Sequence, residues 1–109
     1  MSDAFQNREK GFERKFELDQ AQEFRAGARR DKLFGLWAAS KLSKTGADAD
    51  AYAAAVVDSN FEKPGDDDML GKVRADFKVA NVAVSDTELT TKLAESFAAA
   101  AKQILDEKK

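Results

Sequence analysis

The side chains that most often carry enzyme chemistry are scarce in this chain. Its 109 residues include no cysteine and no histidine. This excludes disulfides, thiolate nucleophiles, Ser-His-Asp triads and metal sites that need imidazole or thiolate ligands. The 20 acidic side chains form no recognisable catalytic constellation, and paired carboxylates act only within a shaped pocket. We therefore expect a protein that is not an enzyme and that holds no cofactor or metal.

A run of three aspartates, Asp66, Asp67 and Asp68, is the strongest candidate for cation binding. It lacks the spaced ligands of a calcium loop. Acidic residues at the start of a helix are stabilised by the helix dipole. The favoured interpretation of the run is therefore structural.

A second cluster is basic and lies beside Asp31. Its members are Arg25, Arg29, Arg30 and Lys32. Such a cluster could contact a phosphate or an acidic partner, but a solvated helix face is the favoured interpretation. The chain has no Gly-rich phosphate loop of the GxxxxGK[ST] type. A weak purine nucleotide site formed by this cluster and a crevice near Trp37 is a minor alternative.

Residues 1–19 form the most distinctive segment. On a helix, Phe5, Phe12 and Phe16 fall within an arc of about 40°, surrounded by charged side chains. Gly11 costs such a helix about 1 kcal/mol relative to alanine, and an isolated helix of this length is marginally stable in water. The pattern is typical of a helix that forms in a partner's groove with aromatic anchors, although the three side chains could instead join the core. The predicted partner-binding residues are Phe5, Arg8, Glu9, Lys10, Phe12, Glu13, Arg14, Lys15 and Phe16.

The remaining residues must supply a folded domain. Hydrophobic residues make up 43% of the chain and apolar positions recur every three or four residues, without strand-like alternation. This predicts an all-α, four-helix protein with a long, partly flexible N-terminal helical segment. The first helix is expected over residues 3–43 and the second after an N-cap at Asp48. The third follows the aspartate run, and the fourth begins at the capping-box spacing of Ser85 and Glu88.

The predicted core follows the apolar face of each helix. Short loops favour antiparallel neighbours in a small bundle. Gly46 is expected to end the first helix in a left-handed conformation, and Gly27 and Gly35 to allow close packing or a bend. The predicted core residues are Phe24, Ala28, Leu33, Leu36, Trp37 and Leu42, then Tyr52, Ala55, Val56 and Ser59, then Met69, Leu70, Val73 and Phe77, and finally Leu89, Leu93, Phe97, Ala100, Ile104 and Leu105.

Charge and hydropathy limit the partners and the compartment. With 18 basic and 20 acidic residues, the net charge of −2 argues against a nucleic-acid binder. The N-terminus shows no apolar core of a secretory signal. No apolar run approaches the ~18 residues that span a bilayer. We expect a cytoplasmic protein that does not insert directly into a membrane.

Several motifs together resemble one family. Residues 28–39, ARRDKLFGLWAA, are similar to the A-R-R-[ND]-K-L-[LF]-G-L-W-A-A block of the alphaproteobacterial F-type ATP synthase zeta subunit, an ATPase inhibitor family. The similarity covers nearly the whole chain and is least diagnostic after Leu93; Asn7 replaces the more usual aspartate. Further matching motifs are Asn7-Arg8-Glu9, Phe12-Glu13, Lys15-Phe16, Lys44-Thr45-Gly46, Tyr52-Ala53, Val56-Val57, Phe61-Glu62, and the stretches 65–68, 72–76 and 84–89.

This resemblance implies an inhibitor of ATP hydrolysis with two parts. Residues 1–19 would be the inhibitory segment, mobile when free, and residues 20–109 a helical globular domain. The segment would insert as a helix at a catalytic alpha/beta interface near the central stalk, contacting the alpha, beta and gamma subunits. The protein would then be cytoplasmic and peripheral on the inner membrane through ATP synthase. The alternative is a small helical nucleotide-binding or adaptor module without inhibitory activity.

Overall fold

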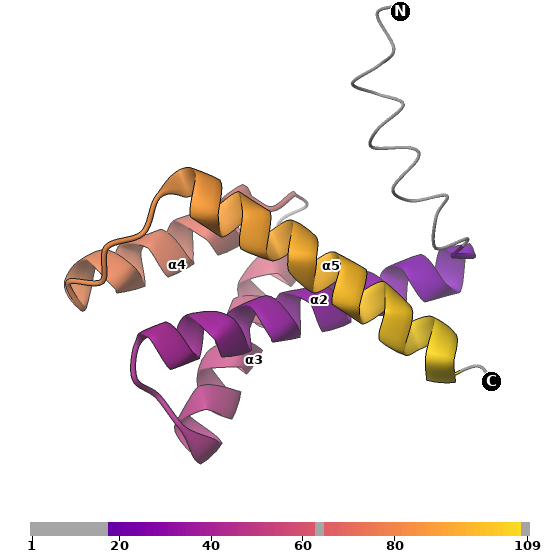
Figure 1. Ribbon diagram of the computed structural model, residues 1–109, viewed down its shortest axis with the longest axis horizontal. Coiled ribbons are helices and arrows are strands. Elements are labelled where there is room, and N and C mark those ends of the chain that lie inside the picture. Colours follow the sequence, from indigo (N-terminus) through magenta and orange to yellow (C-terminus); the bar gives the residue numbers. More distant parts are fainter. Residues whose placement is uncertain (1–17, 63–64, 108–109) are drawn as a thin grey trace, which may run out of the picture.

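Helices account for nearly all of the chain that the computed structural model describes, residues 18–62 and 65–107 (Figure 1). They are α2 (Gln20–Lys41), α3 (Gly46–Glu62), α4 (Asp67–Val79) and α5 (Asp86–Glu107). Neither range contains a strand. The predicted all-α class with four helices is confirmed.

The first predicted helix is not continuous over its whole range. Asp19 has an extended backbone, with φ −77° and ψ 175°, and acts as the N-cap of α2. A helix that runs without interruption through residues 3–43 is therefore wrong, because no α-helix passes through a residue with such a ψ. The part of the prediction that falls on residues 1–17 lies outside the described residues.

The turn between the first two helices also differs from the prediction. The helix α2 ends at Lys41, and the left-handed position after it is taken by Ser43, with φ 61°. Gly46 does have a positive φ, 56°, but it is the first residue of α3 and not the end of α2. Asp48 consequently lies in the first turn of α3, where the helix dipole favours an acidic residue, and is not its N-cap.

The predicted cap of the last helix is confirmed. The backbone N–H of Glu88 donates a hydrogen bond to the Ser85 hydroxyl oxygen at 3.0 Å, directly before α5. The preceding helix, α4, is followed by Asn81 in a left-handed conformation, and the Val82 N–H donates to the Phe77 carbonyl at 2.8 Å. This 6→1 bond is the Schellman pattern that closes a helix.

The helix α2 lies at the centre of the fold. It packs extensively against both α3 and α5, whereas α4 contacts mainly α3 (Figure 1). The expectation that the last three helices are successive antiparallel neighbours is therefore wrong for α4 and α5, because α5 returns across α2. One end of the molecule brings the start of α2 close to the end of α5, which the ion pair between Arg25 and Glu107 confirms.

The predicted core is largely correct for the last three helices; in α2, Trp37 and Leu42 pack against the core but are not fully buried, and the other predicted positions are not part of it. Tyr52, Val56, Met69, Val73, Phe77, Leu89, Leu93, Ala100 and Ile104 are buried as predicted, whereas Ala55 is exposed and Ser59, Leu70, Phe97 and Leu105 are partly buried. In α2, Phe24 is 67% exposed, and Ala28, Leu33, Leu36, Trp37 and Leu42 are only partly buried. The buried apolar side chains of α2 are Ala26, Phe34, Ala38 and Ala39.

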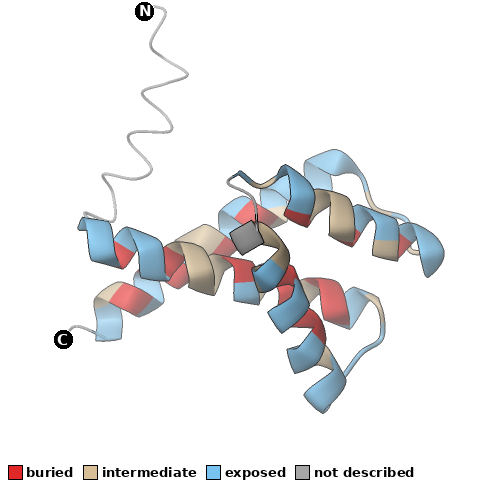
Figure 2. Ribbon diagram, turned by 180° about the vertical axis from the view of Figure 1, so that it is seen from behind, coloured by how far each residue is buried: buried red, intermediate tan, exposed pale blue. Residues whose placement is uncertain are grey.

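This shift has a physical reason. Helices α3 and α5 pack against different parts of α2, so its buried positions spread around the helix and no longer form a single stripe (Figure 2). Gly35 contributes to the α2–α3 contact, because a Cβ at this position would lie 2.8 Å from the Ala53 Cα. Close packing at Gly35 is thus confirmed. No such explanation holds for Gly27, where a Cβ would meet no atom within 4 Å.

Candidate functional site

The side chains predicted to bind a partner lie outside the described residues. These are Phe5, Arg8, Glu9, Lys10, Phe12, Glu13, Arg14, Lys15 and Phe16. Within the segment 1–19, the structure describes Leu18 and Asp19. The roles of these nine side chains stay predictions. Of this segment, the structure describes only the residues that join it to α2.

That junction is a reciprocal capping box. The Gln22 N–H donates to the Asp19 carboxylate oxygen Oδ1 at 2.7 Å, and the Asp19 N–H donates to the Gln22 side-chain oxygen Oε1 at 3.0 Å. The box satisfies two backbone donors at the start of α2 and fixes the conformation of both residues. Sequence reasoning missed it, although an aspartate three residues before a glutamine has the spacing of a capping box.

The end of α5 is held against the start of α2. Arg25 Nη2 lies 3.2 Å from Glu107 Oε1, and Arg29 also pairs with the Glu107 carboxylate. The hydrogen bond from Arg29 is the main cause that lowers the pKa of Glu107, and the charges of both arginines add to it. A hollow of about 190 Å³ lies beside this pair, lined by Asp19, Ala21, Gln22, Arg25, Ile104 and Glu107.

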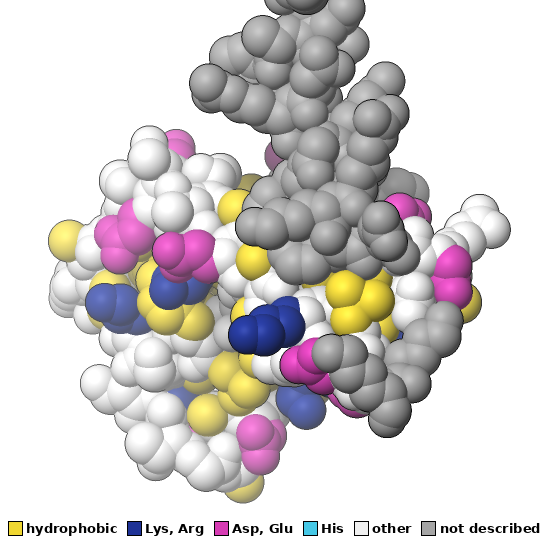
Figure 3. All heavy atoms as spheres, turned by 45° about the vertical axis from the view of Figure 1, so that its right-hand side comes forward, with side chains coloured by type: hydrophobic (Ala, Val, Ile, Leu, Met, Phe, Trp, Pro, Cys, Tyr) yellow, Lys and Arg dark blue, Asp and Glu magenta, His cyan; other side chains and the backbone are white. Residues whose placement is uncertain are grey.

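The predicted solvated face is correct for Arg25 and Lys32, which are exposed, and wrong for Arg30, whose side chain is only 19% exposed. Arg25 and Arg29 pair with Glu107, and Arg30 pairs with Asp31 and Asp66. In Figure 3, basic side chains likewise lie beside acidic ones on the visible face and do not gather in one patch. The cluster works mainly as a set of contacts between helices.

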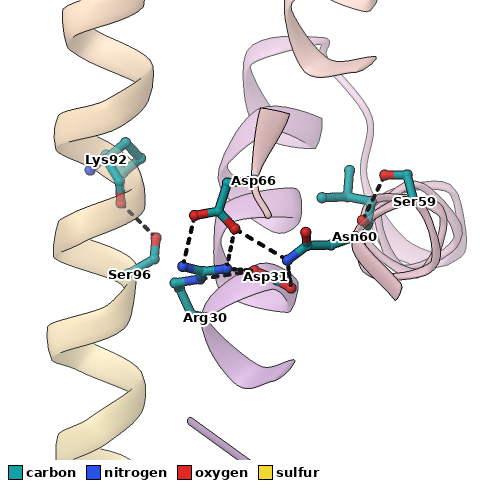
Figure 4. A network of polar contacts seen from close by, with 8 residues as sticks. Arg30, Asp31, Ser59, Asn60, Asp66, Lys92 and Ser96 are labelled. Atoms are coloured by element: carbon teal, nitrogen blue, oxygen red, sulfur yellow. Dashed lines mark hydrogen bonds and ion pairs between the residues drawn. The ribbon is translucent and has the colours of Figure 1, made fainter. Parts of the chain in front are cut away.

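The most buried of these contacts is a network around Arg30 (Figure 4). Its guanidinium binds Asp66 through two hydrogen bonds, of 2.8 and 3.3 Å, and donates to Asp31 Oδ1 at 2.9 Å. Asn60 Nδ2 donates to the other oxygen of Asp31 at 2.7 Å. The Arg30 side chain is 19% exposed and Asp31 is 4% exposed. The network connects α2, the last turns of α3 and the start of α4.

The electrostatics of the network favour the charged form of Arg30. Burial alone would lower the pKa of this guanidinium, but the charge of Asp31 and the hydrogen bond to Asp66 outweigh burial and raise it. A buried charge is tolerated only when it is paired and hydrogen-bonded. The network is therefore a structural element that depends on all of its members.

The aspartate run acquires its structural role through this network. Asp66 directs its carboxylate to Arg30 and makes no side-chain cap to α4, while Asp67 and Asp68 lie in the first turn. Across residues 18–62 and 65–107, no group of three or more His, Cys, Asp or Glu side chains is arranged to hold a metal ion.

Trp37 packs against the core as predicted. Its ring stacks on Phe34 with centroids 5.7 Å apart and packs edge-on against Phe77 with centroids 5.8 Å apart. The Lys92 ammonium lies 5.8 Å from the Trp37 centroid. The arginines invoked for a nucleotide site, Arg29 and Arg30, already have carboxylate partners. The argument for a nucleotide site near Trp37 is therefore weaker than the sequence alone suggests.

A larger hollow, of about 440 Å³, lies between the C-terminal part of α4 and the start of α3. It is lined by Leu42, Lys44, Tyr52, Lys72, Asp76, Val79 and Ala80. The Tyr52 hydroxyl donates to Asp76 at 2.8 Å, and Lys72 lies 3.1 Å from the same carboxylate oxygen. Burial, and then the hydrogen bond to Asp76, raises the pKa of Tyr52. This polar cluster joins α3 to α4.

Among the helices described, none is long and apolar enough to cross a membrane. In the comparisons with known proteins, the family model described as "ATPase inhibitor subunit zeta" matches residues 1–103. The match includes the segment 1–19 and extends into the last turns of α5. A search of curated proteins finds no match.

Proposed function

Because the chain belongs to the ATPase inhibitor subunit zeta family, we propose that it inhibits ATP hydrolysis by F-type ATP synthase through its segment 1–19. The segment would insert as a helix at a catalytic alpha/beta interface near the central stalk and block rotation in the hydrolysis direction. The observation that carries the proposal is the extent of the family match, which includes this segment and its aromatic stripe.

The chemistry of the segment is suited to this role. Phe5, Phe12 and Phe16 would fill apolar pockets, and buried aromatic anchors supply much of the binding energy of such contacts. The surrounding charges would set register and partner choice. Ordering the segment on binding costs conformational entropy, which the burial of the anchors must exceed.

The described part of the chain would act as the body that limits how far the segment enters. Its core draws on all four helices and includes Phe34, Val56, Met69, Phe77 and Leu89. We therefore expect this core to form without residues 1–19, and the protein to separate into an inhibitory segment and a folded stop.

The decisive experiment is an ATPase assay on the purified catalytic sector. The full chain should inhibit hydrolysis. A variant that lacks residues 1–19 should stay helical and unfold cooperatively, with a thermal transition lowered only by the loss of the Asp19 N-cap, but lose inhibition. The triple variant Phe5→Ala, Phe12→Ala, Phe16→Ala should behave like the deletion, because it removes the anchors and keeps the charges.

Two results would overturn the proposal. Full inhibition by the deletion variant would show that the segment is not the inhibitory element. Absence of inhibition by the intact, folded chain would show that this family member does not inhibit by any route. Pull-down of ATP synthase subunits by the intact chain would then separate a silent binder from a protein that binds elsewhere.

A further inference from the structure

The capping box at the start of α2 uses the backbone donors that a continuous helix would need. In a helix running through this point, the N–H groups of Asp19 and Gln22 would donate to carbonyls four residues earlier. Here the Asp19 N–H donates to the Gln22 side chain, and the Gln22 N–H donates to the Asp19 side chain. The ψ of 175° at Asp19 also turns the chain out of the helical path. The direction of the chain therefore changes at a defined residue.

The capping box is supported by the packing of Gln22 beside the end of α5. Gln22 is only 5% exposed, although its side chain is polar. It lines the same hollow as Ile104 and Glu107 from the end of α5, and Arg25 ties that end to the first turns of α2. The orientation of Asp19 is thus coupled to the packing of two helices, and not only to its own helix end.

We propose that Asp19 and Gln22 are positioning residues for inhibition: their capping box sets the direction in which the segment 1–19 leaves the domain. This inference rests on the proposed function. A segment that must enter an interface while a folded body stays outside it binds better when its exit direction is already correct, because less freedom is lost on binding. Without the box, α2 can extend towards the N-terminus, and molecules with that extension are not competent to bind.

The test compares two N-caps of the same chain. Asp19→Ala removes the cap at the junction, Asp19→Asn keeps a side-chain oxygen that can accept the same bond, and Ser85→Ala removes the cap of α5. An N-cap of typical strength changes the ratio of capped to uncapped molecules about fivefold. We expect the inhibition constant to rise in Asp19→Ala, by at most about this factor, and to stay at the wild-type value in Asp19→Asn and Ser85→Ala.

A distance measurement supplies a readout that general stability does not change. Because the chain has no cysteine, spin labels can be placed at Ser2→Cys and Lys102→Cys without competing sites. Asp19→Ala should shift the distance distribution between the labels, and Ser85→Ala should not. All measurements use the full chain below its thermal transition, which circular dichroism determines for each variant.

The outcomes separate the two ideas. If wild type inhibits but Asp19→Ala matches it in both inhibition and distance, the positioning role is wrong. Equal weakening by Ser85→Ala and Asp19→Ala would assign the effect to stability and also overturn it. If wild type does not inhibit, the proposed function fails, while an unshifted distance in Asp19→Ala still counts against the positioning role.

Discussion

Two sets of polar contacts involve the same short run of arginines in α2, but one set lies at the surface and the other is buried. Arg25 and Arg29 meet Glu107 at the surface, where the glutamate side chain is 44% exposed. Arg30, the next residue along, belongs to a network in which Asp31 is 4% exposed. One step along a helix turns the side chain by about 100°, from the edge of α5 towards α3 and α4.

This difference shows that the direction in which a charged side chain leaves the helix determines how much its ion pair contributes to the free energy of unfolding. At the surface, water and salt screen the attraction, so an ion pair adds little to the free energy of unfolding. In the network, Asp31 is buried and Arg30 is largely shielded, and each partner compensates the desolvation of the others. The surface pair therefore serves to align the ends of α2 and α5, whereas the network fixes how α3 and α4 meet α2.

The largest effect should come from Asp31→Ala. This variant leaves the Arg30 guanidinium with Asp66 alone and removes the nearer of the two acceptors of Asn60. Removing one partner of a buried pair costs about 3–5 kcal/mol of unfolding free energy when the remaining charge is left unpaired; because Arg30 keeps Asp66, we expect a loss near the lower end of this range. Urea denaturation followed by circular dichroism measures it. Lys32→Ala, the adjacent exposed position, is the matched control and should change stability by less than about 0.5 kcal/mol. Equal transitions for the two variants would contradict the role of the network.

An intermediate effect is expected for Asp66→Ala. Its carboxylate makes two hydrogen bonds to Arg30 but is 38% exposed, so solvent screening reduces the loss to about 1–2 kcal/mol. Asp67→Ala, one residue later in the first turn of α4, should lose only a helix-dipole contribution of about 0.3–1 kcal/mol. A double-mutant cycle with Arg30→Ala measures the coupling. No coupling between Asp66 and Arg30 would mean that the aspartate acts only through the helix terminus.

The same contrast explains what could be predicted from the sequence. Local signals were reliable: helical periodicity identified the helices after Pro64, and the Ser85 spacing identified a cap that the structure contains. The core face of α2 could not be predicted, because it depends on which helices pack against it. Phe24 is apolar and exposed, whereas Asp31 is charged and buried, and one of its partners, Asn60, reaches it only in the fold.

The candidate site also combines features that are local in the sequence with contacts between distant residues. The aromatic stripe of residues 1–19 is a local pattern that the sequence displays directly, and the family match includes it. The junction at Asp19 also had a local signature, but continuous periodicity on both sides concealed it. The tie between Glu107 and α2 joins residues 78 and 82 positions apart, which no local pattern reveals.

The smallest effect, and the one that depends most on conditions, is expected for Glu107→Gln. In the folded state the hydrogen bond from Arg29 lowers the pKa of Glu107, and the charges of Arg29 and Arg25 add to this shift. A carboxylate whose pKa is lower in the folded state stabilises the fold above its unfolded-state pKa, and this contribution disappears as the pH falls through the folded-state pKa. The stability difference between wild type and Glu107→Gln should therefore be present at neutral pH and vanish in acid.

Added salt should also reduce the stability difference for Glu107→Gln, because the ion pair is at the surface. The stability loss in Asp31→Ala should persist in high salt. Urea denaturation across pH and salt measures both dependences; a Glu107→Gln difference that survives acid and high salt would place this contact with the buried network.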